Sequence, residues 1–129
     1  METILRTINL TKRYNNKLAV ENVNMNINRG DIYGFIGKNG AGKTTMFKMI
    51  TGLVSSTSGS IELFGESTEN GLHTMRKRLG ALIERPFLYT NMTAYENLEA
   101  CRLQKGIPGK DCIERILTLL NLNSIRDKK

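Results

Sequence analysis

The sequence predicts an α/β fold, in which an antiparallel β edge leads into a buried strand, a glycine-rich loop and a helix. Three observations indicate this class. Two strand patterns open the chain, the nearly continuous apolar run 32–36 follows them, and a helical pattern begins after the glycines of residues 37–42. The length of 129 residues allows one modest domain with a usable core.

The opening strands, residues 4–10 and 18–27, are predicted from their apolar positions. A polar segment, 12–16, separates them and is expected to form the turn. In the second strand apolar residues alternate with asparagines, which is typical of a strand with one buried and one wet face. We therefore expect an antiparallel pair. The apolar positions are Ile4, Ile8, Leu10, Val23, Met25 and Ile27.

A strand, loop and helix unit follows. Residues 32–36 are almost all apolar, so this strand should be covered on both faces. After the loop, apolar residues recur at helical spacing, and Gly52 is a natural stop for that helix. The helical positions are Met46, Met49, Ile50 and Leu53.

The remaining elements are shorter. A strand is predicted at 61–64, a weakly patterned helix at 72–79 and another strand at 81–83. Thr93 and Glu96 have the spacing of a capping box, which predicts the start of a helix. Its expected buried face consists of Ala94, Leu98 and Cys101. A second amphipathic helix should follow Pro108-Gly109, with apolar positions Ile113, Ile116, Leu117 and Leu120.

The composition limits which classes of function are compatible with the sequence. Hydrophobic residues make up 40% and charged residues 24%, as in ordinary globular chains. The net charge of +7 would suit nucleic acid, an anionic membrane or a phosphorylated ligand. The basic residues are scattered and no aromatics are interleaved with them, so we expect no nucleic-acid partner. Two distant cysteines and one histidine argue against a zinc site, and the lack of a signal peptide or long apolar run favours the cytosol.

The chemistry lies in one complete phosphate-binding loop, Gly37-Lys38-Asn39-Gly40-Ala41-Gly42-Lys43-Thr44. It follows a predicted buried strand and precedes a predicted helix, which is the context this motif requires. A glycine-rich turn that merely joins a strand to a helix is the alternative. The full eight-residue pattern in this context favours binding of ATP with Mg²⁺.

Each residue type in the loop suits a triphosphate. Gly37, Gly40 and Gly42 let successive backbone amides point at phosphate oxygens, and the helix adds its positive N-terminal end. Lys43 is the catalytic candidate, because its ammonium would reach the β- and γ-phosphates. Thr44 offers a hydroxyl to Mg²⁺, and Thr45 is expected near the α-phosphate. The cradle is completed by Asn39 and Ala41.

Motifs along most of the chain resemble those of ABC transporter ATP-binding subunits, and so of P-loop NTPases. Besides the loop and its preceding strand, they are Thr11-Lys12-Arg13-Tyr14, Ala19-Val20-Glu21-Asn22-Val23, Thr57-Ser58-Gly59-Ser60-Ile61, Gly65, Leu79-Gly80-Ala81 and Thr93-Ala94-Tyr95-Glu96-Asn97-Leu98. The run 80–86 is similar to ATPases of bacterial exporters that protect against bacitracin or lantibiotic peptides.

The resemblance implies two further site residues. Tyr14 matches the aromatic residue that stacks on adenine, although an exposed turn tyrosine would look the same. Glu84 stands where the family has a glutamine near Mg²⁺ and the attacking water, so it is a catalytic and metal-binding candidate. An ordinary surface charge is the alternative for Glu84. Residues 86–89 would lie near the face that meets a transmembrane subunit.

The resemblance also implies the domain plan and partners. The chain would be the N-terminal part of one ATP-binding domain, with a nucleotide-binding core portion at 1–90 and the start of a helical subdomain at 91–129. The signature motif and the acidic catalytic strand are not found in it, so we expect binding with little turnover. The intact ATPase would pair with a second ATP-binding subunit. It would lie on the inner face of the cell membrane through a permease and power export, with an antimicrobial peptide or drug as the expected substrate. The alternative is a soluble ABC-type switch acting on ribosomes or nucleic acid.

Overall fold

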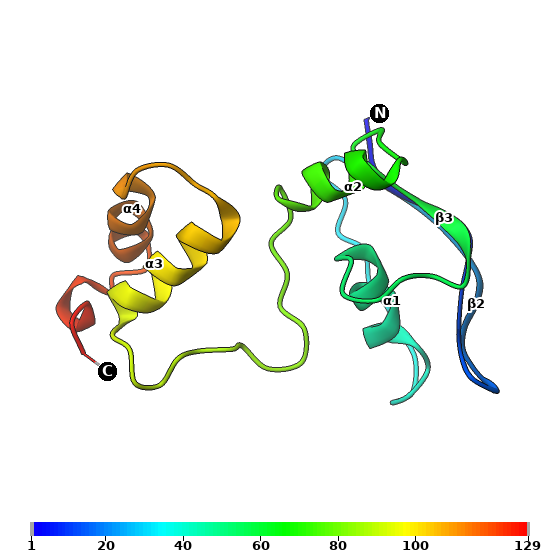
Figure 1. The fold of residues 1–129 in the computed structure, drawn as a ribbon, viewed down its shortest axis with the longest axis horizontal. Coiled ribbons are helices and arrows are strands. Elements are labelled where there is room, and N and C mark those ends of the chain that lie inside the picture. The colour runs from blue at the N-terminus through cyan, green and yellow to red at the C-terminus, as the bar shows by residue number, and fades with distance from the viewer. Residues whose placement is uncertain (1, 129) are drawn as a thin grey trace. The chain divides into compact units, whose positions relative to one another are not determined.

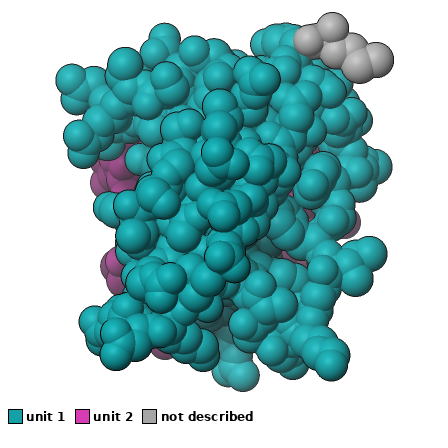
Figure 2. All heavy atoms as spheres, turned by 90° about the vertical axis from the view of Figure 1, so that its right-hand side faces the viewer, with its two compact units in different colours: residues 1–85 teal, residues 86–129 magenta. Residues whose placement is uncertain are grey.

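A computed structural model describes residues 2–128, which form two compact units. Unit 1 comprises Met1–Arg85 and unit 2 comprises Pro86–Lys129 (Figure 2). The predicted boundary between a nucleotide-binding core portion, 1–90, and the start of a helical subdomain, 91–129, stays a prediction.

Unit 1 is built on a three-stranded antiparallel sheet with the order β2-β1-β3 (Figure 1). The strands are β1 (Thr3–Tyr14), β2 (Lys17–Asn28) and β3 (Ser58–Leu63). The predicted antiparallel opening is therefore confirmed, but the turn is shorter than predicted. Residues 12–14 continue β1, because Arg13 pairs with Leu18 and Tyr14 with Lys17. Only Asn15 and Asn16 are left to turn the chain, and Asn15 adopts the positive φ of 49° that such a turn uses.

The core of unit 1 lies between this sheet and helix α1 (Lys43–Ile50). Met46, Met49 and Ile50 of α1 are buried at helical spacing, as predicted. Leu53 lies beyond the end of the helix and is exposed, so its predicted place on this face was wrong. Helix α2 (Glu69–Arg76) begins three residues before the predicted start and ends three before the predicted end. Its Arg76 donates from Nε to the Ile50 carbonyl over 3.1 Å at the end of α1. The buried core residues are Leu10, Val20, Met25, Met46, Met49, Ile50, Ile61 and Leu63.

Two predicted strands are absent from the described residues. Segments 32–36 and 81–83 contain no assigned strand, and Ile32 and Ile36 are fully exposed rather than buried. The predictions were wrong because apolar sequence alone does not make a strand. A strand needs a neighbour that accepts and donates its backbone hydrogen bonds. No backbone hydrogen bond from another part of residues 2–128 reaches segment 32–36.

Unit 2 consists of α3 (Ala94–Lys105), α4 (Asp111–Leu119) and the 3₁₀ turn η1 (Asn123–Ile125). The capping box is confirmed: the Thr93 hydroxyl accepts from the Glu96 amide, and Glu96 Oε2 accepts from the Thr93 amide over 2.7 Å. Cys101 is exposed, so its predicted burial was wrong. The buried apolar contacts come instead from Ile113 and Leu117 of α4. Within residues 2–128, no helix has the length and apolar character needed to cross a membrane.

Candidate nucleotide site

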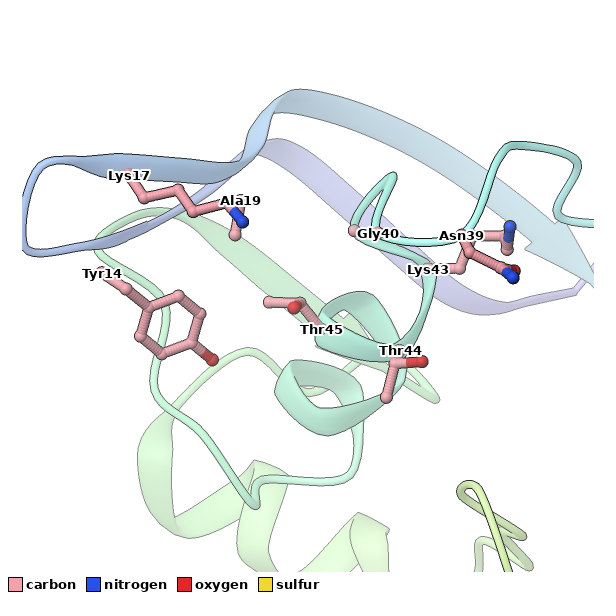
Figure 3. Close-up of a pocket in the computed structure, with 9 residues that line it drawn as sticks. Tyr14, Lys17, Ala19, Asn39, Gly40, Lys43, Thr44 and Thr45 are labelled. Atoms are coloured by element: carbon pink, nitrogen blue, oxygen red, sulfur yellow. The ribbon is translucent and has the colours of Figure 1, made fainter.

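A cavity of about 460 Å³ opens in unit 1 where the β1–β2 hairpin, the glycine-rich loop and the start of α1 come together. Figure 3 shows side chains from all three elements around it. The structure therefore brings Tyr14, remote in sequence, to the same cavity as the phosphate loop. The lining residues are Tyr14, Lys17, Ala19, Asn39, Gly40, Gly42, Lys43, Thr44 and Thr45.

The loop is shaped from the hairpin side. Gly42 has φ 92°, in the left-handed region that side chains rarely adopt. A Cβ added there would lie 2.3 Å from the Ala19 carbonyl oxygen of β2. Two separate constraints therefore require glycine at position 42: the backbone angle and the close approach of the hairpin. Consequently the last turn of the loop is fixed where α1 begins.

The interior of the loop presents positive charge. Lys43 donates from Nζ to the Gly37 carbonyl, and to the Lys38 carbonyl over 3.0 Å. These contacts keep the ammonium across the loop. Helix α1 begins at Lys43 with no acidic side chain in its first turn and no side chain capping its first amides. The ammonium, the free amides and the helix dipole therefore act on the same space, which suits a dense anion such as a triphosphate.

The remaining predicted loop residues divide into two groups. Asn39, Gly40, Thr44 and Thr45 line the cavity. Gly37 and Ala41 lie within the loop and shape it: Gly37 supplies a carbonyl to Lys43, and the Ala41 amide donates to the Lys38 carbonyl over 3.1 Å. The cradle is therefore built mainly from backbone, with Lys43 as its one cationic side chain among the cavity-lining residues of the loop.

Tyr14 lies at the other end of the cavity from the loop and is 43% exposed. The register of the hairpin places it opposite Lys17, which explains why both residues line the cavity. In Figure 3 the Tyr14 ring extends from the hairpin toward the side of α1 that carries Thr45. An aromatic face that shares a cavity with a phosphate cradle has the chemistry needed to hold a nucleotide base.

Glu84 belongs to a second cavity, of about 350 Å³, that it shares with Lys43 and Thr44. The structure therefore brings Glu84 to the same cavity as Thr44, the other residue predicted to hold Mg²⁺. Its carboxylate is 3.2 Å from Lys48 Nζ on α1, and its backbone has a φ of 63°. Because Lys48 is four residues after Thr44, both side chains lie on one face of α1.

Sequence reasoning missed three residues of this region. Lys17 and Ala19 line the main cavity, and Lys48 pairs with Glu84. The hairpin register, once the turn is limited to Asn15 and Asn16, would have indicated Lys17. The helical spacing from Thr44 would have indicated Lys48. No sequence signal indicated the contact between Ala19 and the loop.

Comparison with known proteins gives consistent similarities. The sequence model of the family described as "ABC transporter" matches residues 20–129. The bacitracin transport ATP-binding protein BcrA of Bacillus licheniformis is 43% identical over 95% of this chain and 40% of that protein. The lantibiotic transport ATP-binding protein SrtF of Streptococcus pyogenes is 45% identical over 92% of this chain and 48% of that protein. The chain thus spans less than half the length of these relatives.

Solved structures show the same likeness. The ATP-binding subunit of an ABC transporter superposes with a TM-score of 0.81 at 28% identity, over 96% of this chain and 53% of that one. The predicted class, a P-loop NTPase core with an antiparallel β edge, is confirmed by this likeness and by the sheet described above.

Proposed function

The chain belongs to the ABC transporter family, and we propose that its main cavity binds ATP, with the triphosphate in the glycine-rich loop and the base on Tyr14. The observation that carries this proposal is the convergence of Lys43, the free N-terminus of α1 and Tyr14 on one cavity. Each part alone is common in proteins. Together they offer positive charge for the triphosphate and an aromatic face for the base of a nucleotide.

Different residues of the cavity contact different parts of ATP. Amides of the loop and of the first turn of α1 donate to phosphate oxygens, and Lys43 neutralises charge at the β- and γ-phosphates. The α-phosphate lies near Thr45. Tyr14 holds the base by stacking, which depends little on base identity, so discrimination between ATP and GTP should be loose.

The residues available fit Mg²⁺ as the usual companion of ATP. The Thr44 hydroxyl lies beside the loop, and the Glu84 carboxylate shares a cavity with it, so both would hold the ion together with phosphate oxygens. When bound, Mg²⁺ offsets negative charge on the triphosphate. The pairing with Lys48 reduces the charge that Glu84 brings toward the phosphates.

For the whole protein, we propose an ATPase subunit that drives export of an antimicrobial peptide or drug through a separate permease. The names of the relatives, bacitracin and lantibiotic transport ATP-binding proteins, support export over the ribosome or nucleic-acid alternative. Exposed apolar residues Phe87 and Leu88 in unit 2 support contact with such a partner. The subunit would then sit on the inner face of the cell membrane.

Turnover is proposed to need more than this chain contains. No residue described above supplies a second catalytic carboxylate or a contact that closes over the γ-phosphate. We propose that both come from further segments and from a second ATP-binding subunit that clamps ATP between the two. Residues 1–90 would then be the nucleotide-binding core portion, and 91–129 the start of a helical subdomain.

The test compares this chain with a version extended to the full length of its relatives. Mg-ATP binding and phosphate release are measured on both, each with its Lys43→Ala variant. We expect both chains to bind and only the longer one to release phosphate. If the short chain releases phosphate and its Lys43→Ala variant does not, the proposal that turnover needs further segments is wrong. Co-purification of the longer chain with RNA instead of a membrane protein would refute the transport role.

A further inference from the structure

Lys12 lies against the aromatic ring proposed to hold the base. Lys12 and Tyr14 are two residues apart on β1, so their side chains leave the strand on the same face. The Lys12 ammonium is 5.0 Å from the centroid of the Tyr14 ring. This is within the distance of about 6 Å at which a cation is attracted to an aromatic face.

The same ammonium is anchored on a second element. Lys12 Nζ donates to the Ser55 carbonyl over 2.6 Å, in the loop that follows α1. That loop is itself tied to β1, because the Thr57 amide donates to the Thr11 carbonyl over 2.8 Å. The Arg13 amide in turn donates to the Thr57 hydroxyl over 3.0 Å. The hydrogen bond to Ser55 therefore restrains the Lys12 side chain in its position on the ring.

The ammonium contacts the ring but does not belong to the residues that line the cavity. Tyr14 lines the main cavity, whereas Lys12 does not. The cation–π contact therefore restrains the ring without placing Lys12 among the residues that line the space for the base. A ring already held in this orientation loses less side-chain freedom when a base stacks on it.

We propose that Lys12 is a positioning residue for nucleotide binding, which fixes the Tyr14 ring so that its cavity face accepts the base. This inference rests on the proposed function, in which Tyr14 stacks on the base. Lys12 itself touches neither the base nor the phosphates. Its effect should therefore be confined to ligands that carry a base, and should vanish when the ring is removed.

The experiment measures the affinities of Mg-ATP and of Mg-tripolyphosphate, which has the phosphates but no base. The variants are Lys12→Met, Lys12→Arg, Tyr14→Ala and the double variant Lys12→Met with Tyr14→Ala. We expect Lys12→Met to weaken Mg-ATP binding about three-fold, a size typical of an exposed cation–π contact. Mg-tripolyphosphate affinity should not change. Lys12→Arg should restore Mg-ATP binding, and Lys12→Met should have no further effect once Tyr14 is alanine.

Control variants distinguish positioning of the ring from a general loss of positive charge or of the fold. Lys77→Met removes one positive charge from an exposed position of unit 1 and should leave both affinities unchanged. Thermal unfolding of each variant shows whether the fold is retained. Equal weakening of Mg-tripolyphosphate, an equal loss in the Tyr14→Ala background, or no loss at all would each overturn the role of Lys12. Failure of the proposed function looks different, because Mg-ATP affinity would then be insensitive to Tyr14→Ala or to Lys43→Ala.

Discussion

Two parts of unit 1 flank the nucleotide cradle and differ in how their backbone is held. The β1–β2 hairpin is fixed by a paired ladder on one side of the loop, and Ala19 of β2 presses directly on Gly42. Segments 32–36 and 81–83 are largely apolar and lack such pairing among the described residues. The hairpin side of the cradle is therefore held by backbone hydrogen bonds, whereas the segment that enters the loop is held by side-chain packing, such as that of Phe35 against Phe47 of α1.

The largest effect is expected where the hairpin meets the loop. In Gly42→Ala the left-handed backbone costs about 1–2 kcal/mol, and the new methyl group collides with the Ala19 carbonyl oxygen. We expect Mg-ATP affinity to fall at least about ten-fold, as measured by calorimetric titration, because the amides of the cradle move. Gly80→Ala is the matched control, since its added Cβ would meet no atom within 4 Å. Equal effects of the two changes would mean that the close approach of the Ala19 carbonyl does not position the loop.

Inside the hairpin, the effect is expected on the free energy of unfolding and not directly on the nucleotide site. Thr7 is 2% exposed, and its hydroxyl donates to the Val23 carbonyl and accepts from the Met25 amide, each over 3.0 Å. Thr7→Val keeps the shape but leaves both groups without this partner, so the free energy of unfolding should fall by about 1–3 kcal/mol. Urea unfolding measures it. Thr7→Ser should retain most of the stability, and a Thr7→Val variant as stable as the parent would contradict this account.

The open end of the hairpin should respond to acid. Glu2 accepts from Arg29 Nε over 2.6 Å, and this hydrogen bond and the charge of Arg29 lower the pKa of the Glu2 carboxyl. A carboxyl whose folded pKa is lowered stabilises the fold above its unfolded pKa, and this contribution is lost as the pH falls through the folded pKa. The melting temperature of Glu2→Gln should therefore lie slightly below that of the parent at pH 7 and converge with it in acid. A constant difference at every pH would exclude this ion pair as the cause.

The smallest effect is expected in the unpaired segment. Ile36 is fully exposed, so Ile36→Ser should change the free energy of unfolding by no more than about 0.5 kcal/mol. Leu10→Ala, in the core of the hairpin side, should cost about 2–5 kcal/mol under the same conditions. If both substitutions cost the same, Ile36 is packed in solution and the described exposure of this position is wrong.

The sequence predicted features formed by neighbouring residues better than it predicted which distant segments pair with one another. The capping box at Thr93 depends on residues that are close in sequence, and it is confirmed. The phosphate loop is also local in sequence, and its residues Asn39, Gly40 and Lys43 line one cavity, although the buried strand expected before it is absent from the described residues. Tyr14 could be placed only through a family resemblance, because its approach to the loop depends on the hairpin register. Strands at 32–36 and 81–83 were predicted from hydrophobicity alone, which does not specify a hydrogen-bonding neighbour. The contacts of Lys12 with Ser55 and of Lys48 with Glu84 join segments far apart in sequence, so no local pattern contained them.

The most direct test of the central claim, that the loop is a nucleotide cradle, is a titration of the chain and of Lys43→Ala with Mg-ATP. The parent should bind, and the variant should bind at least about ten-fold more weakly, because a charge-assisted contact with the phosphates is lost. Lys77→Ala, which removes an exposed lysine of the same unit, should bind like the parent. Equal affinity of the parent and Lys43→Ala would mean that the loop does not hold the triphosphate, and the proposed site would be wrong.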